Sequence, residues 1–138
     1  MPTTPTKEDY VETIWSLISN KGYARVTDIG ERLGINNASV TKMIQKLDGD
    51  GILVYEKYRG IDLTQEGYQL GQKLSERHRI LEQFLLQLGA KNHTEVFQTV
   101  EGIEHYIDAN TLSLISHLLE FIQKNPEWWA KFLHEKDK

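Results

Sequence analysis

The spacing of apolar residues predicts helices along most of this chain. In residues 7–21 the apolar side chains recur every three or four positions, as they do on one face of an amphipathic helix. Thr6 is placed to cap this helix, and Gly22 ends it. The apolar stripe consists of Tyr10, Ile14, Leu17 and Ile18.

Two shorter helices are predicted next, joined by a tight turn. The first is capped by Thr27 and ends near Leu33, and Gly34 supplies the positive φ that such a turn needs. Either Asn36 or Asn37 caps the second helix. Two helices in this arrangement form a helix-turn-helix, although any short helical hairpin can resemble one.

The residues after the helix-turn-helix indicate a winged helix. In residues 52–64 apolar and polar residues alternate, as they do in two short strands around a turn, here at "YRG". The second helix runs to about residue 50, and its exposed face is small, polar and basic up to Asp48, which suits a DNA major groove. Basic wing residues can meet phosphates. The alternative is an ordinary solvated helix face. The predicted DNA contacts are Asn37, Ser39, Thr41, Lys42, Gln45, Lys46, Lys57 and Arg59.

The second half of the chain reads as helices only. One of them, at 109–123, is apolar over a wide face, so part of that face is expected to meet a partner. A symmetric dimer would present two reading helices to a two-fold DNA site. The remaining helices are predicted at 65–88, capped by Thr64, at 93–106, and from Pro126 onward.

The sequence therefore predicts a mostly α protein, with an N-terminal winged helix-turn-helix and a C-terminal helical dimerisation domain. The expected division is a DNA-binding domain at 1–64, a linker helix at 65–89, and a dimerisation and metal-binding domain at 90–138.

Composition narrows the possible functions. The 138 residues carry a net charge of −4. This charge excludes a protein that binds nucleic acid through a basic surface all around, but it permits a local basic patch. The chain has no cysteine, so disulfides and thiolate metal sites are excluded. Neither an apolar signal core nor a bilayer-length apolar run is present, so we expect a cytoplasmic protein without membrane contact.

Three groups of residues are candidates for metal chemistry. In "VEGIEHYID" the residues Glu101, Glu104 and His105 share one side of a helix. Ile103 is expected on the buried face of that helix, and Glu104 at its margin. Asp9 and Glu12 are one turn apart in the first helix, and His78 stands in the apolar stripe of the long helix where leucine is expected. Each group alone is better explained as solvated acids or a core histidine. If the helices converge, four carboxylates and two imidazoles form a pocket that suits divalent cations such as Mn²⁺ or Fe²⁺.

Five segments resemble the manganese-responsive branch of the diphtheria toxin repressor family. They are "EDYVETIW", "ARVTDIGERLGINNASVTKMIQKL", "YEKYRGIDLT", "RHRILEQFL" and "VEGIEHYID", and the likeness covers about residues 5–123. The resemblance implies a homodimeric repressor with a binuclear manganese site, two Mn²⁺ ions per subunit, that represses manganese uptake genes. It also implies the ligands Asp9, Glu12, His78, Glu101, Glu104 and His105. The iron branch carries methionine and cysteine at the places of Asp9 and Glu101, and neither is found here.

Two other classes of function remain open at this stage. A binuclear metal hydrolase could use the same carboxylates and imidazoles, but it would leave the winged helix without a role. A winged-helix regulator that senses an organic ligand would leave the acids merely solvated.

Overall fold

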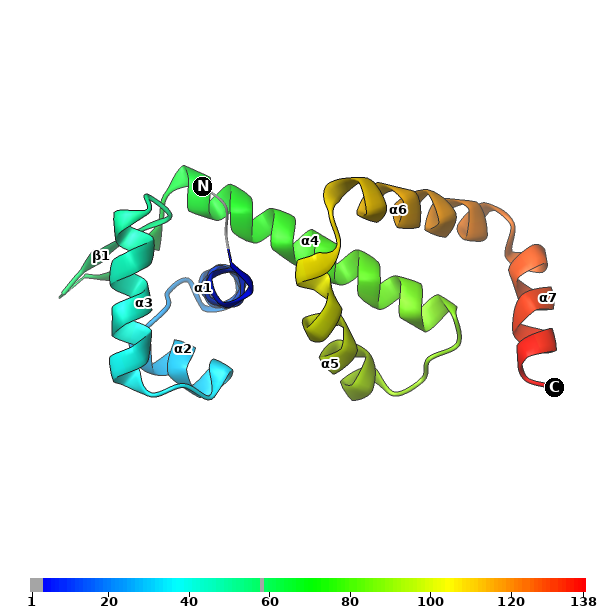
Figure 1. The fold of residues 1–138 in the computed structure, drawn as a ribbon, viewed down its shortest axis with the longest axis horizontal. Coiled ribbons are helices and arrows are strands. Elements are labelled where there is room, and N and C mark those ends of the chain that lie inside the picture. Colours follow the sequence, from blue (N-terminus) through cyan, green and yellow to red (C-terminus); the bar gives the residue numbers. More distant parts are fainter. Residues whose placement is uncertain (1–3, 58) are drawn as a thin grey trace. The chain divides into compact units, whose positions relative to one another are not determined.

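The computed structural model describes residues 4–57 and 59–138, and it divides into two compact units at Ser75 and Glu76. The chain is mostly helical, as expected (Figure 1). Among the described residues, no helix is both long enough and apolar enough to cross a membrane.

The first unit is a winged helix, which confirms the prediction. Its elements are α1 (Pro5–Lys21), α2 (Val26–Leu33), α3 (Asn37–Gly49), β1 (Leu53–Glu56), β2 (Gly60–Leu63) and the beginning of α4 (Gln65–Gln87). The two strands pair antiparallel, with Leu53 opposite Leu63 and Glu56 opposite Gly60. Tyr58, in the predicted turn of the wing, lies outside the described residues.

One apolar core holds the first unit together. The predicted stripes of α1 and α3 face inward, and the wing and α4 close the core. Burial of these side chains provides the main stabilising free energy of the unit. The buried members are Tyr10, Val11, Ile14, Leu17, Ala24, Ile29, Val40, Ile44, Leu47, Ile52, Leu53, Ile61 and Leu74.

Two glycines allow the tight helix-turn-helix. Gly34 has φ +68°, the left-handed conformation that the sequence predicts for this turn. A Cβ at Gly30 would lie 2.7 Å from the carbonyl oxygen of Ile35. Only glycine therefore permits α2 to approach the following turn this closely.

The helix caps differ from the prediction at two helices. Thr4, not Thr6, caps α1 through its hydroxyl, which accepts the Lys7 backbone N–H. Arg25, not Thr27, is the N-cap residue of α2, and no side chain caps that helix. In both cases the helix begins earlier than the apolar pattern indicates, since the first turn of a helix need not carry core residues.

Asn36 caps the helix that carries the predicted DNA-reading face. Its Oδ1 accepts the Ser39 backbone N–H at 2.9 Å, so Asn36 and not Asn37 is the cap. We expect Asn36→Ala to lower the free energy of unfolding by about 1 kcal/mol, because one N–H of the first turn loses its acceptor. Urea unfolding followed by circular dichroism measures this change. Asn37→Ala is the matched control, and an equal loss in that variant would contradict the assignment of the cap.

The second unit consists of helices packed around a smaller core. Its elements are the remainder of α4, α5 (His93–Ile103), a 3₁₀ turn η1 (Glu104–Tyr106), α6 (Ala109–Lys124) and α7 (Pro126–Lys136). Leu81, Val96 and Val100 are its most buried cluster. The indole N–H of Trp129 donates to the backbone oxygen of Gln87 at 2.6 Å and attaches α7 to the end of α4.

Capping residues position the elements around η1. Asn92 accepts the Glu95 backbone N–H at the start of α5, at 3.1 Å. Asp108 accepts the Thr111 backbone N–H at 2.7 Å at the start of α6. This hydrogen bond lowers the pKa of the Asp108 carboxyl, so the cap remains ionised in mildly acidic solution.

Large apolar side chains remain on the surface of α6 and α7. Leu114 is 61% exposed, and Phe121, Trp128 and Phe132 are each at least 40% exposed. Exposed apolar side chains gathered on neighbouring helices are typical of surfaces that meet another protein chain.

Candidate metal centre and DNA interface

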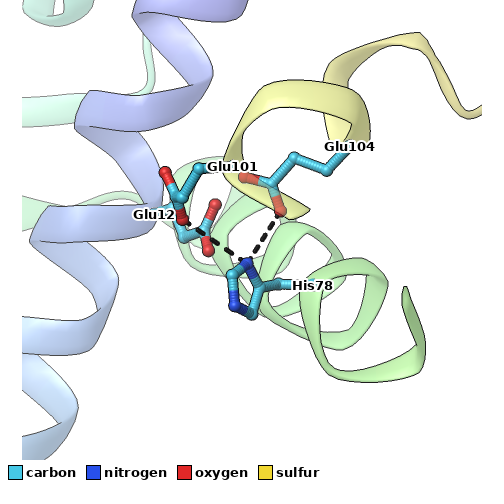
Figure 2. Close-up of side chains that lie close together, drawn as sticks. All are labelled: Glu12, His78, Glu101 and Glu104. Atoms are coloured by element: carbon cyan, nitrogen blue, oxygen red, sulfur yellow. Dashed lines mark hydrogen bonds and ion pairs between the residues drawn. The ribbon is translucent and has the colours of Figure 1, made fainter. Parts of the chain in front are cut away.

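His78 lies at the centre of a cluster of carboxylates in the second unit. It interrupts the apolar stripe of α4 as predicted and is 9% exposed. Its Nδ1 lies 3.0 Å from Glu104 Oε2 and 3.4 Å from Glu101 Oε1, and Figure 2 shows the ring directed toward both carboxylates. The histidine is therefore surrounded by acids rather than by apolar groups alone.

Glu104 is more buried than the sequence indicates. It is 0% exposed, whereas Ile103, expected on the buried face, is 40% exposed. The α-helix ends at Ile103 and continues as a 3₁₀ turn. The Glu104 carboxylate packs against His78 of α4, and a helical wheel drawn for one helix does not include a contact with another helix. The prediction that Glu104 lies at the margin was wrong for this reason.

The second oxygen of Glu104 faces another imidazole. Glu104 Oε1 lies 3.9 Å from His105 Nε2, at ion-pair distance. His105 Nδ1 is 3.4 Å from a guanidinium nitrogen of Arg77, a buried cation that the sequence reading did not include. One fully buried carboxylate thus lies between two imidazoles, one at each oxygen.

Glu82 is a further carboxylate that the sequence reading missed. Its Oε2 lies 3.1 Å from His78 Nε2, although the two groups are not aligned as a hydrogen bond. At this distance the contact is an ion pair when the His78 imidazole is protonated. The spacing of the two residues, four apart on one helix, could have revealed it.

The donor atoms of this cluster fit a divalent cation. One ligand atom from each of His78, Glu101 and Glu104 lies within 4.8 Å of the others. Metal–ligand bonds of about 2.0–2.5 Å require separations of this order. Imidazole nitrogens and carboxylate oxygens, without sulfur, suit manganese, iron or zinc better than soft metals.

Asp9 and Glu12 lie in the first unit, one turn apart on α1. Both are half-buried, whereas the neighbours Tyr10, Val11 and Ile14 are buried in the core. The two acids therefore lie beside the core-facing stripe of α1 and not within it.

The helix α3 presents the face expected to read DNA. Val40, Ile44 and Leu47 are buried on one side of the helix. On the other side every predicted contact is exposed except Thr41, which is half-buried. The exposed residues are Asn37, Ser39, Lys42, Gln45 and Lys46.

The wing carries the two predicted phosphate contacts. Lys57 and Arg59 are exposed. Arg59 also pairs with Glu56 at 3.4 Å, a contact that the sequence reading did not foresee. Both partners are largely exposed, so the pair is weak and leaves the guanidinium available to a stronger anion.

A winged helix combined with a helical unit that gathers carboxylates and imidazoles defines a metal-responsive transcriptional regulator. Residues 2–61 match the family model for the iron-dependent repressor N-terminal DNA-binding domain. Residues 64–128 match the model for the iron-dependent repressor metal-binding and dimerisation domain. The chain belongs to the iron-dependent repressor family.

Curated relatives support the same assignment. The HTH-type transcriptional regulator MntR of Lysinibacillus sphaericus is 51% identical over 127 residues, which cover 92% of this chain and 90% of that protein. The protein of the same name from Listeria innocua is 49% identical over 137 residues, which cover 99% and 94%.

Solved structures agree with the fold. The metal-dependent transcriptional regulator MtsR has a TM-score of 0.77 and 29% identity, over 86% of this chain and 55% of that one. The manganese regulator SloR has a TM-score of 0.75 and 26% identity, with the same coverage. The chain thus spans about half the length of these two proteins. It is a metal-responsive, DNA-binding, dimeric transcriptional repressor and not an enzyme, so the hydrolase alternative and the organic-ligand alternative are unsupported.

Proposed function

We propose that Mn²⁺ is the metal that this repressor senses, and that two ions bind per subunit. The observation that carries the proposal is Glu104, a fully buried carboxylate whose two oxygens face two different imidazoles. A buried carboxylate is costly unless it is paired, and a cation near each oxygen would compensate it. The proposed ligands are Asp9, Glu12, His78, Glu101, Glu104 and His105.

Charge supports the count of two ions. The proposed set holds four carboxylates, so two divalent cations would balance it. His78 and His105 approach different oxygens of Glu104, which favours one ion beside each imidazole. When bound, the metal supplies positive charge that holds the ligand-bearing helices together; it performs no chemistry on a substrate.

Two arguments favour manganese over other divalent ions. The donor atoms are oxygen and nitrogen only, as manganese accepts. The two relatives from Lysinibacillus sphaericus and Listeria innocua carry the name MntR, and SloR is titled a manganese regulator. Affinity alone would favour zinc or copper, so selection for manganese has to come from geometry and coordination number.

The regulatory mechanism that we propose is linkage. Metal that binds acids on α1 together with residues of the second unit would restrict the spacing of the two DNA-reading heads in the dimer. The metal-bound dimer then binds DNA more tightly than the metal-free dimer. The gain in binding free energy equals the free energy by which metal favours the DNA-binding arrangement over the others. We further propose a two-fold symmetric operator at manganese uptake genes, a cytoplasmic location, and domains at 1–64, 65–89 and 90–138.

The assignment of Asp9 and Glu12 can be tested by calorimetry. Asp9→Asn and Glu12→Gln keep the side-chain volume and remove one charge. Each is expected to weaken Mn²⁺ binding by at least about tenfold, because loss of a ligand costs at least as much as loss of a group that supports one. Glu31→Gln, an exposed acid on α2, is the control. If both α1 variants bind Mn²⁺ as tightly as wild type does, Asp9 and Glu12 are not metal ligands.

Lys42 tests the DNA-reading face of α3. Lys42→Ala is expected to weaken binding to the operator by about 1–3 kcal/mol while Mn²⁺ binding stays unchanged. The operator is obtained by selection from random duplex DNA with the Mn²⁺-loaded full chain, and affinity is measured by fluorescence anisotropy. An unchanged affinity would show that another face of the helix meets DNA.

Arg59 tests the wing. Arg59→Ala is expected to weaken binding to all duplex sequences alike and to reduce the slope of log affinity against log salt by about one. The same anisotropy assay, repeated over a range of salt concentrations on operator and scrambled DNA, measures both effects. A loss confined to the operator would make Arg59 a base reader instead.

A further inference from the structure

One ion pair joins the helix that carries Asp9 and Glu12 to the end of the DNA-reading helix. Lys7 Nζ on α1 lies 2.8 Å from Asp50 Oδ2, at the C-cap of α3. The two side chains are only 23% and 20% exposed, although the residues are 43 apart in sequence. Both belong to the first unit.

Helix stability does not account for these two charges. Lys7 lies in the first turn of α1, and Asp50 ends α3. A cation near a helix N-terminus and an anion near a C-terminus both oppose the helix dipole. Each charge is therefore unfavourable in its own helix, and what compensates it is the contact with the other.

Both ends of the ion pair are fixed to the backbone of their helices. The Lys7 backbone N–H donates to Thr4 Oγ1, the cap of α1, at 3.2 Å. The Asp50 backbone N–H donates to the Lys46 carbonyl oxygen at 2.9 Å. The ion pair therefore joins two helix ends whose backbones are held by hydrogen bonds, through side chains that are largely buried.

The C-terminal end of α3 also holds the wing. Asp48 Oδ2 accepts the backbone N–H of Tyr55, in β1, at 3.0 Å. Asp50, two residues later, holds α1. The last turn of α3 is thus a junction at which α1, the DNA-reading helix and the wing meet.

We propose that the Lys7–Asp50 ion pair transmits the position of α1 to α3 and the wing, and so couples metal binding to DNA binding. Lys7 and Asp50 are positioning residues in this role and touch neither metal nor DNA. The inference rests on the proposed function, because it needs Asp9 and Glu12 on α1 to bind the metal. Lys7 is two residues from Asp9, so the link and the proposed ligands share one end of the helix.

The test measures the ratio of operator affinity with Mn²⁺ to that without it, by fluorescence anisotropy on the full chain. Lys7→Met and Asp50→Asn are each expected to lower this ratio about two- to fivefold, the upper part of the range for ion pairs near a protein surface. The double variant should lose no more than either single one, because both changes break the same contact. Lys21→Met, at the exposed end of α1, removes the same charge as Lys7→Met and should leave the ratio unchanged.

Charge exchange provides a rescue. Lys7→Asp combined with Asp50→Lys restores an ion pair and places both charges at the helix ends that favour them. The combined variant should recover the wild-type ratio, whereas Lys7→Asp alone should lower it further than Lys7→Met. A merely structural role would change thermal stability without changing the ratio.

The outcomes separate this inference from the proposed function. A wild-type protein whose DNA binding ignores Mn²⁺ would overturn both. A wild-type response together with equal ratios in Lys7→Met and Lys21→Met would overturn the coupling role alone. Additive losses in the double variant would also overturn it, since the two residues would then act separately.

Discussion

His78→Leu is expected to leave a folded dimer that no longer responds to Mn²⁺. Leucine restores the apolar stripe of α4, so packing favours the fold. The change also removes the nitrogen that lies 3.0 Å from buried Glu104, and an unpaired buried acceptor costs about 1–3 kcal/mol. We therefore expect a somewhat less stable apo protein whose Mn²⁺ affinity is lower by more than about 100-fold.

Calorimetric Mn²⁺ titration and metal-dependent operator binding on the same preparation test this expectation. His117→Leu, the same change at an exposed position of α6, is the control and should behave as wild type. If His78 were only a core histidine, the leucine variant would bind Mn²⁺ and respond to it normally. That result would show that His78 is not a metal ligand, and it would count against the whole proposed set of ligands.

Glu104→Gln is expected to have the largest effect on metal binding. Glutamine fills the same volume but removes the negative charge that faces both imidazoles. Because Glu104 would help to hold both ions, the variant should lose binding at both positions, not at one. The apo protein should be at least as stable as wild type, since a buried charge is replaced by a neutral amide.

Metal stoichiometry and thermal unfolding without metal measure these two effects. Glu120→Gln, an exposed acid on α6, controls for the loss of one charge. A Glu104→Gln protein that still binds two Mn²⁺ ions with wild-type affinity would show that the buried carboxylate has a structural role only.

Apolar periodicity was enough to predict the helices and strands of both units, except that the helix predicted at 93–106 ends at Ile103 and continues as the 3₁₀ turn η1. The helices repeat apolar residues every three or four positions, and Gly22 and Gly34 end helices in the left-handed conformation that glycine favours. His78 could also be found from the sequence, because it breaks a regular stripe on α4. The apolar pattern of a segment thus predicts its secondary structure, and a polar residue that interrupts the pattern is a candidate functional residue.

The burial of Glu104 could not be predicted in this way. Glu104 is buried because its carboxylate packs against His78 of α4, whereas Ile103 stays 40% exposed. The contacts of Arg77 with His105 and of Lys7 with Asp50 join residues far apart in sequence. Such contacts depend on how different helices pack against each other, and the periodicity of a single helix does not predict that packing.

Operator binding as a function of Mn²⁺ concentration, at fixed salt, tests the central claim most directly. Salt must be held constant because it alone changes the affinity of a protein for DNA. We predict that Mn²⁺ raises the affinity of the full chain for the selected operator by about 5- to 150-fold, the usual range of coupling between two sites. An affinity that is the same with Mn²⁺ and with a chelator would contradict the account.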